Sequence, residues 1–341
     1  MKEEISTKFN KVFVLGGTGF LGYHTIKELL NNDIKVKTLS LPPKKDTVIK
    51  EDNPLEGMDN VECLVGNINE MNDHEVVEML SDCDGFIYAA GADERIQAEI
   101  PAKRFYYEAN VLPTQRMVRL ACQAGLKKFV VFGSYFAEMA ERYPETGLKD
   151  SPYINTRLLQ EQVAFAEGEG KMEVCGLRLP YIFGTMKERM PLWQMFVDRI
   201  RDNDVYPVFK GGTACVTATQ VGEAAVGALL YGHHRETFAI GDINMTYEEF
   251  ANIIKDELGT NTQIPVITLE EGLPTYKELD RNLADQNRES GIHMEMIAHV
   301  QQKFCYLNWA DTFPKLHVKR EDIREELRKT IRYIIELENQ Q

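Results

Sequence analysis

The chain has 341 residues, of which 43% are hydrophobic and 27% charged, and its formal net charge is −14. Its length allows one large α/β domain or a nucleotide-binding domain with a smaller lobe. The negative charge argues against a nucleic-acid partner, because such affinity comes largely from Lys and Arg neutralising phosphates.

A location in the cytoplasm is expected from two features. No apolar run approaches the roughly 20 residues needed to span a bilayer, and residues 1–10 lack the apolar stretch of a secretion signal. We therefore expect neither a membrane nor a nucleic acid as a partner.

Strands and helices are predicted to alternate along the first half of the chain. Short apolar segments predict strands at 11–15, 36–41, 61–65, 85–90, 129–132 and 174–179. Helical periodicity predicts helices at 23–30, 73–80, 110–124 and 153–167. This alternation predicts an α/β fold of the Rossmann type, with a doubly wound parallel sheet.

The pattern becomes less regular beyond residue 184, as expected of a smaller, substrate-binding lobe. We assign 10–184 to the nucleotide-binding domain and 185–341 mainly to the lobe and C-terminal helices, with 214–245 expected to return to the sheet. Further helices are predicted at 221–230, at 246–258, where Thr246 and Glu249 form a capping-box pattern, and at 320–337.

A glycine-rich turn follows the first predicted strand and opens the first helix. Gly16, Gly19 and Gly22 give the pattern G-x-x-G-x-x-G. A pyrophosphate fits at a helix N-terminus only where the backbone comes close, and only glycine leaves that room. The turn therefore predicts a dinucleotide cofactor.

The choice between NAD and NADP depends on the end of the second strand. Ser40 stands near where an acidic residue would bind the ribose 2′-hydroxyl of NAD. Lys44 and Lys45 follow and could hold a 2′-phosphate, or could simply be solvated loop lysines. The pattern slightly favours NADP and leaves NAD open.

Tyr153 and Arg157 are four residues apart, so they share one face of a predicted helix. Beside a nicotinamide cofactor, such a tyrosine and cation can work as one unit. Spacing alone also fits a tyrosine packed on the sheet and an arginine paired with Glu161.

The six cysteines are predicted to be reduced and mostly buried. They stand singly, without a Cys-x-x-Cys pair or a histidine at zinc-ligand spacing. We predict no metal site.

Several ordered motifs accompany the glycine turn. They are Gly66-Asn67-Ile68, Ala89-Ala90-Gly91, Asn110-Val111, Phe132-Gly133-Ser134 and Leu177-Arg178-Leu179-Pro180 before Tyr181-Ile182-Phe183-Gly184. With the glycine turn, they resemble the extended short-chain dehydrogenase/reductase superfamily, in particular its NAD-dependent epimerase/dehydratase group, over about residues 10–260.

This resemblance implies a set of site residues. The cofactor would contact Gly16, Thr18, Gly19, Phe20, Leu21, Gly22, Ser40, Lys44, Asn67, Ile68, Ala89, Ala90, Gly91, Asn110, Tyr153, Arg157 and Pro180. Ser134 would hold the substrate oxygen and Tyr153 would be the general acid/base, its pKa lowered from about 10 by a fixed cation.

Arg157 stands where the family has a lysine that also binds the nicotinamide ribose. Arginine keeps the positive charge, but its planar fork is wider, so the exchange is not conservative in a crowded site. The resemblance predicts an NAD(P)-dependent oxidoreductase or epimerase. A weak or inactive NAD(P)-binding regulatory protein is the alternative.

The substrate is left open by a second departure from the family. Sugar-nucleotide members carry an arginine that grips the diphosphate, in the segment that here reads Thr213-Ala214-Cys215-Val216-Thr217-Ala218-Thr219-Gln220. Lys187, Arg189, Arg199 and Arg201 could replace it or could be solvated helix charges.

Aromatic residues near the predicted site either line an apolar pocket or pack in the core. They are Tyr135, Phe136, Tyr181, Phe183, Trp193 and Phe196. The expected partner is a small-molecule substrate, and a sugar nucleotide is one candidate for it. The resemblance also implies a homodimer through the helices at 110–124 and 153–167.

Overall fold

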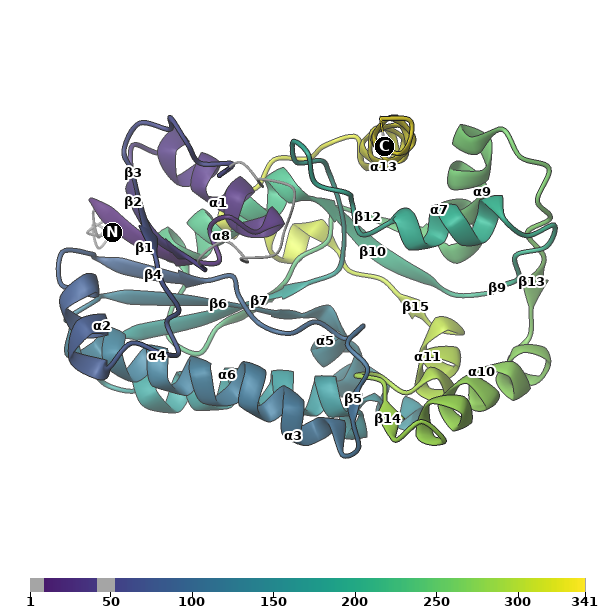
Figure 1. Cartoon of the computed structure of the whole chain (residues 1–341), viewed down its shortest axis with the longest axis horizontal. Coiled ribbons are helices and arrows are strands. Elements are labelled where there is room, and N and C mark those ends of the chain that lie inside the picture. The colour runs from purple at the N-terminus through teal and green to yellow at the C-terminus, as the bar shows by residue number, and fades with distance from the viewer. Residues whose placement is uncertain (1–8, 42–52, 341) are drawn as a thin grey trace.

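A seven-stranded sheet forms the centre of the computed structural model, which describes residues 9–41 and 53–340 (Figure 1). Its strands lie in the order β3-β2-β1-β4-β6-β7-β11, and all neighbouring pairs are parallel. They are β1 (Lys11–Leu15), β2 (Lys35–Ser40), β3 (Val61–Val65), β4 (Gly85–Tyr88), β6 (Lys128–Ser134), β7 (Glu173–Leu179) and β11 (Thr237–Ala239). The predicted Rossmann-type fold class is confirmed.

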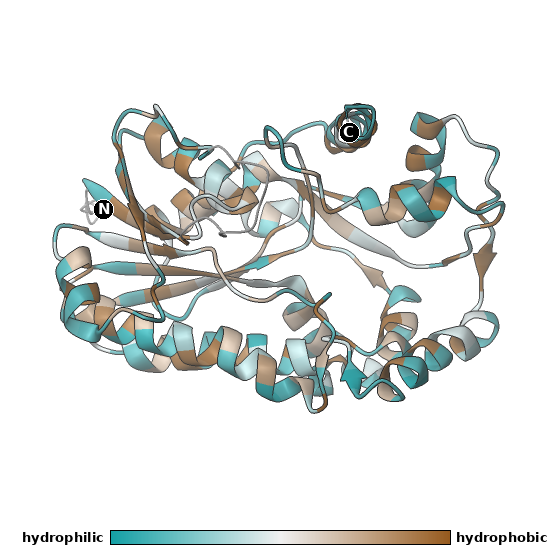
Figure 2. Cartoon of the chain, in the orientation of Figure 1, coloured by the Kyte–Doolittle hydropathy of each residue, from teal (hydrophilic) through white to brown (hydrophobic). Residues whose placement is uncertain are grey.

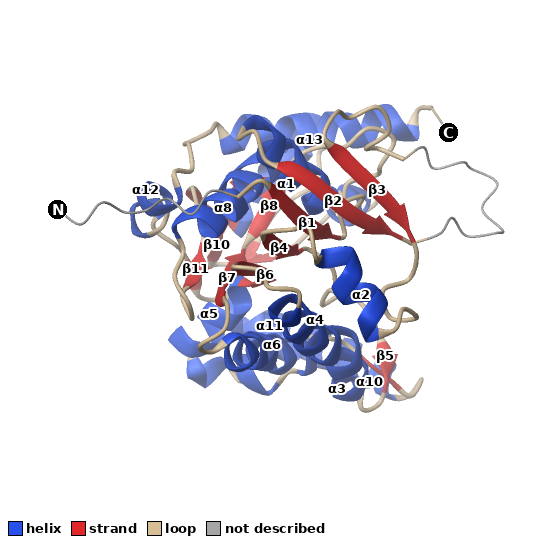
Figure 3. Ribbon diagram, turned by 90° about the vertical axis from the view of Figure 1, so that its left-hand side faces the viewer, coloured by secondary structure: helices blue, strands red, loops and turns tan. Residues whose placement is uncertain are grey.

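Helices cover both faces of this sheet, as the view turned by 90° makes clear (Figure 3). One layer holds α1 (Phe20–Asn31) and α8 (Ala218–Tyr231), with α12 (Phe313–Leu316) packed on α8. The other holds α2 (Asp73–Leu80), α4 (Leu112–Gln123) and α6 (Pro152–Gly168). α5 (Tyr135–Arg142) follows β6 directly.

Apolar side chains fill both spaces between sheet and helices, and hydrophobic residues concentrate on the strands in Figure 2. Val14 and Val130 belong to the core that faces α1 and α8, whereas Phe86 and Phe129 belong to the core that faces α4. The parallel strands all end at the same edge of the sheet, and the loops that carry the site follow them there. Because the two cores hold the strands and helices in place, they also fix the positions of these loops.

The rest of the chain forms a smaller lobe with short strands. A four-stranded sheet contains β8 (Tyr181–Phe183), β10 (Gly212–Thr217), β12 (Ile243–Thr246) and β15 (Phe304–Cys305). Two-stranded pairs join β9 (Val208–Phe209) with β13 (Val266–Ile267), and β5 (Ala98–Glu99) with β14 (Arg288–Glu289). The helices are α7 (Gln194–Arg201), α9 (Tyr247–Leu258), α10 (Leu269–Ala284), α11 (Met294–Gln301) and α13 (Ile323–Glu338), with 3-10 turns at Pro144–Thr146, Leu148–Asp150 and Trp309–Asp311.

The helix predicted at 110–124 begins earlier than the sequence pattern indicates. A helical run starts with α3 (Ala102–Tyr106), passes through a π-helical turn η1 (Tyr107–Val111) and continues as α4. In the π turn the Leu112 N–H bonds the Tyr107 carbonyl. Pro113 has no N–H to give and its ring would clash with the carbonyl four residues earlier, so the run widens there.

The cysteines are unpaired, as predicted. Burial raises the pKa of the Cys175 thiol to about 12, which keeps it protonated and unreactive.

Within residues 9–41 and 53–340, no helix is both long and apolar enough to cross a membrane. The same residues contain no group of three His, Cys, Asp or Glu side chains placed to hold a metal.

Arg178 joins β7 to α6 through a buried ion pair. Its Nε and Nη2 donate to both oxygens of Glu161 at 3.1 and 2.8 Å, and both side chains are 6% exposed. Its Nη1 also bonds Glu138 and Glu141 of α5. This arrangement fixes the helix that carries Tyr153.

We predict that Arg178→Met lowers the free energy of unfolding by about 3–5 kcal/mol, because the Glu161 charge would stay buried without a partner. Arg119→Met is the matched control: Arg119 makes the same two-pronged contact with Glu167, but its side chain is 53% exposed. Arg119→Met should lower the free energy of unfolding by less than about 1 kcal/mol. Urea unfolding measures both, and equal losses would contradict the prediction.

Candidate functional site

The glycine turn between β1 and α1 has the shape of a phosphate cradle. Gly16 has a φ of 89°, and a β-carbon at Gly22 would lie 2.0 Å from the Gly16 carbonyl oxygen. The Gly19 N–H closes the turn on that same oxygen at 2.9 Å. Gly19 caps α1 without a side chain, so the first N–H groups of the helix point to a bare cradle that fits a pyrophosphate.

The end of β4 borders this turn. A β-carbon on Gly16 would lie 2.7 Å from the Ala89 carbonyl oxygen. β1 lies between β2 and β4, where the strand order reverses, and open α/β sheets bind ligands at such a point. The predicted residues Ala89, Ala90 and Gly91 therefore lie beside the cradle.

The loop after β4 is fixed at Ala92. Asn110 Oδ1 accepts from the Ala92 N–H at 2.8 Å, and Asn110 Nδ2 donates to the Ala92 carbonyl at 3.1 Å. Arg157 Nη2 donates to the same carbonyl, also at 3.1 Å. Asn110 belongs to the π turn, so the widened helix supplies one of the two side chains that hold this loop.

Arg157 is bound by the protein itself. It is 7% exposed, and its Nη1 donates to Gln160 Oε1 at 2.7 Å and to the Phe132 carbonyl at 3.3 Å. Gln160 in turn donates to Thr114 of α4 at 2.7 Å. The Nε atom is buried and has no partner among the described residues. The alternative of a surface arginine paired with Glu161 is wrong, since Glu161 pairs with Arg178.

Tyr153 and Ser134 meet beside this arginine. Tyr153, in the first turn of α6, is 4% exposed, and Ser134, the last residue of β6, is 6% exposed. The Arg157 guanidinium carbon lies 5.0 Å from the centre of the Tyr153 ring. The structure therefore brings together the three residues predicted to be catalytic.

The chain can now be compared with known proteins. Residues 12–244 match the model of the NAD dependent epimerase/dehydratase family. The chain belongs to this family.

Curated relatives of the chain include two sterol-related dehydrogenases. The 3-beta-hydroxysteroid dehydrogenase of Mycolicibacterium neoaurum is 23% identical over 198 residues, which is 54% of this chain and 51% of the relative. A sterol-4-alpha-carboxylate 3-dehydrogenase, decarboxylating, of Mus musculus is 22% identical over 67% of this chain and 60% of the relative. The chain thus spans between about half and three-fifths of the length of these relatives.

Solved structures agree on the fold. A mutant UDP-glucuronic acid 4-epimerase from Bacillus cereus, in complex with UDP-4-deoxy-4-fluoro-glucuronic acid and NAD, superposes with a TM-score of 0.70. It is 15% identical, and the match covers 96% of this chain and 99% of the epimerase. At this identity the likeness is one of architecture.

The pKa of Tyr153 differs from the family expectation. Burial has the largest effect and raises the phenol pKa above 10, and the Glu94 carboxylate raises it further. The Arg157 charge and hydrogen bonding to Arg157 and Ser134 lower it, as predicted, but do not outweigh burial. The expected net lowering is therefore wrong for the protein without cofactor.

Glu94 is a member of the site that motif reasoning missed. Tyr106 donates to the carbonyls of Asp93 and Ile96 at 3.0 and 2.7 Å, so it fixes the backbone on both sides of Glu94. The Tyr106 ring packs edge-on against Tyr153, with the centroids 5.6 Å apart. The two carboxylates at Asp93 and Glu94, which follow Ala-Ala-Gly after one alanine, were a visible signal for this residue.

Gly291 is another missed residue. Its carbonyl accepts from the Tyr153 N–H at 2.8 Å, and a β-carbon on it would lie 2.7 Å from the Glu94 carbonyl oxygen. It comes from the C-terminal part of the chain, and no local pattern around it indicates a site.

The remaining predicted cofactor residues have varied surroundings. Thr18, Phe20 and Leu21 belong to the cradle and the start of α1, and Pro180 is buried between β7 and β8. Asn67 uses its amide locally, with Glu70 and the Asn69 N–H. Ile68 is 8% exposed in the core. The side chains of these last two are therefore engaged within the protein.

The ribose end of the cradle is described only in part. Ser40 ends β2, and its hydroxyl is buried without a partner among the described residues. Lys44 and Lys45, on which the preference for NADP depended, lie outside the described residues.

The segment at 213–220, which we call the wall, lies mostly in the protein interior. The side chains from Thr213 to Ala218 are buried, and Thr213 Oγ1 hydrogen bonds the Tyr135 hydroxyl at 2.8 Å. Thr217 and Gln220 cap α8 reciprocally. The wall therefore presents no cation to a substrate diphosphate.

Three of the six aromatic residues belong to the core. Phe183 and Trp193, with ring centroids 5.0 Å apart, pack with Phe250. Tyr135 is 2% exposed, whereas Tyr181 is half-buried. Core packing therefore accounts for Tyr135, Phe183 and Trp193.

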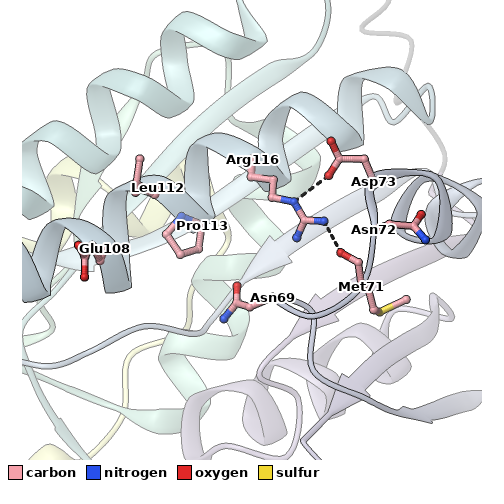
Figure 4. A pocket seen from close by; sticks show the side chains of 8 residues that line it. All are labelled: Asn69, Met71, Asn72, Asp73, Glu108, Leu112, Pro113 and Arg116. Atoms are coloured by element: carbon pink, nitrogen blue, oxygen red, sulfur yellow. Dashed lines mark hydrogen bonds and ion pairs between the residues drawn. The ribbon is translucent and has the colours of Figure 1, made fainter.

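A surface hollow of about 430 Å³ lies between the start of α2 and the η1–α4 run, and Tyr153 is not among the residues that line it (Figure 4). Arg116 crosses it and donates to Asp73 at 2.8 Å and to the carbonyls of Ile68 and Met71 at 2.8 and 2.7 Å. The hollow is a junction between helices. The homodimer through the neighbouring helices stays a prediction.

We predict that Arg157→Lys lowers the free energy of unfolding by about 1–3 kcal/mol, because the donors of an ammonium sit on one nitrogen and cannot span the acceptors at Gln160, Phe132 and Ala92 as the guanidinium fork does. In a Gln160→Leu background the loss should shrink, since one of those acceptors is gone. Urea unfolding measures the cycle. An unchanged stability of Arg157→Lys would show that the fork is not needed.

Proposed function

We propose that this chain is an NAD(P)-dependent oxidoreductase that transfers a hydride between the cofactor and a carbonyl or carbinol carbon of a small molecule. The observation that carries the proposal is the convergence of Ser134, Tyr153 and Arg157 beside the bare glycine cradle. Membership of the NAD dependent epimerase/dehydratase family supports it.

Each residue has a chemical task in this proposal. The bound nicotinamide supplies or accepts the hydride. Ser134 holds the substrate oxygen by hydrogen bonding, and Tyr153 exchanges the proton of that oxygen. Arg157 and Asn110 hydrogen bond the Ala92 carbonyl and so hold the loop after β4 in place. Burial raises the pKa of the Tyr153 phenol, which favours its protonated, proton-donating form.

A carbonyl compound is favoured over a sugar nucleotide as the substrate. The support is the wall at 213–218, whose buried side chains carry no charge for a diphosphate. The relatives named above act on sterols or on a UDP-sugar, so both classes belong in the substrate panel. A purely regulatory role is not favoured, because Ser134, Tyr153 and a buried cation are all in place.

The cofactor is proposed as NAD(P). Solved relatives include complexes with NAD, and no observation supports the preference for NADP. Separate titrations with NAD and NADP decide between the two.

We predict that Tyr153→Phe lowers kcat by about 10²–10⁴-fold, because the phenol proton is lost while the binding surface stays. Tyr107→Phe is the control, since Tyr107 is 40% exposed and lies on η1. NAD(P)H deuterated at nicotinamide C4 is offered with ketones, aldehydes, sterols and sugar nucleotides, and mass spectrometry detects label in the product. Cofactor binding without label transfer to any of them, in wild type as in Tyr153→Phe, would contradict the proposal.

We predict that reduction is independent of pH through neutrality and falls only as the pH approaches the raised pKa of Tyr153. Glu94→Gln removes a negative charge that raises this pKa, so the alkaline limb should move to lower pH. Glu108→Gln, an exposed carboxylate paired with Arg104, is the control. The pH profile of kcat/KM measures this, and an unmoved limb in Glu94→Gln would refute the role of its charge.

A further inference from the structure

The segment at 184–189, directly after β8, crosses the start of α1. The Thr185 carbonyl hydrogen bonds His24 Nε2 of α1 at 3.1 Å. A β-carbon on Gly184 would lie 3.3 Å from the Phe20 ring and 3.0 Å from the Ala218 β-carbon. This segment, which we call the strap, therefore packs closely on the helix that begins in the phosphate cradle.

The C-terminal helix α13 fixes the strap. The Gly184 N–H donates to Thr330 Oγ1 at 3.0 Å. The Tyr333 hydroxyl donates to the Met186 carbonyl and accepts from the Glu188 N–H, both at 2.9 Å. A single phenol thus bonds both sides of the turn that ends at Arg189.

Arg189 reaches from this turn to the backbone of the glycine turn that forms the cradle. Its Nη1 donates to the Thr18 carbonyl at 3.4 Å, and Thr18 lies between Gly17 and Gly19. Among the described residues no carboxylate forms an ion pair with Arg189, so its Nε and Nη2 keep their donors available.

The other cations near the insertion are placed differently. Lys187 pairs with Glu188 and is 84% exposed, and Arg201 pairs with Asp198, Asp202 and Glu338. The guanidinium carbon of Arg199 lies over the Phe196 ring, 6.0 Å from the ring centroid. In a chain with a net charge of −14, an arginine at a phosphate cradle that pairs with no carboxylate of the described residues has a strong electrostatic effect.

We propose that Arg189 binds the pyrophosphate of the cofactor and that α13, through Tyr333 and Thr330, holds it over the cradle. The backbone N–H groups of the cradle offer only partial charges, whereas a guanidinium offers a full charge and a fork that matches two phosphate oxygens. The inference rests on the proposed NAD(P) cofactor. It makes the C-terminal helix part of the cofactor site.

The test compares ligands that carry a diphosphate with one that does not. Calorimetry with ADP, NAD, UDP and adenosine is run on wild type, on Arg189→Gln and on the control Lys187→Gln. We expect Arg189→Gln to weaken ADP and NAD by about 10- to 100-fold, the value of a charge-assisted hydrogen bond, and to leave adenosine unchanged. Lys187→Gln should behave as wild type.

Each outcome separates the two proposals. Wild type that binds neither NAD nor ADP here, and does not bind NADP in the cofactor titrations, would refute the proposed function. Wild type that binds both, with Arg189→Gln binding equally well, would overturn the role of Arg189 alone. A loss confined to UDP would assign Arg189 to a substrate diphosphate and would also overturn it.

Tyr333→Phe tests the contribution of α13. It removes both hydrogen bonds to the strap while keeping the ring, so we expect ADP binding to weaken in the same direction by a smaller factor, about 3- to 10-fold. When Tyr333→Phe is added to Arg189→Gln, ADP binding should not weaken further, because the arginine that Tyr333 positions is already gone. Thermal melts check that each variant is folded, and an additive loss would refute the coupling.

Discussion

The buried guanidinium of Arg157 connects the three parts of the site. It bonds the Phe132 carbonyl in β6, Gln160 on its own helix and the Ala92 carbonyl in the loop after β4. A lysine carries its three N–H donors on a single nitrogen and so cannot spread them over the width of a guanidinium fork, as these contacts require. The arginine therefore acts as a structural tie as well as a charge beside Tyr153.

Helix α6 is fixed on two sides by arginines with different tasks. Arg157 binds it to β6 and the cofactor-side loop, whereas Arg178 of β7 grips Glu161 one turn further along. Tyr153 stands at the start of this helix, where its backbone N–H also meets Gly291. These contacts limit the freedom of the phenol before any ligand binds, which is the condition for a preorganised acid.

The sequence predicts what depends on local pattern. Strand periodicity predicts the bounds of β1 and β3 to the residue. Glycine spacing predicts the turn after β1, where the close contact between Gly22 and the Gly16 carbonyl leaves no room for a side chain at position 22. The π turn at 107–111 breaks that regularity because of Pro113, so the start of its helix was missed. The tie to Ala92 and the contact with Gly291 join distant segments, which periodicity cannot reveal. The direction of the Tyr153 pKa was missed for a similar reason: the neighbouring cation is visible in the sequence, but burial is not.

A crystal structure with NAD bound would test most directly whether Arg157 is a tie. We expect its Nη2 to stay within about 3.2 Å of the Ala92 carbonyl oxygen, within hydrogen-bonding distance, while the nicotinamide lies beside Tyr153. An Arg157 that leaves Ala92 and Gln160 to bind the nicotinamide ribose would contradict this role and would make it a direct substitute for the family lysine.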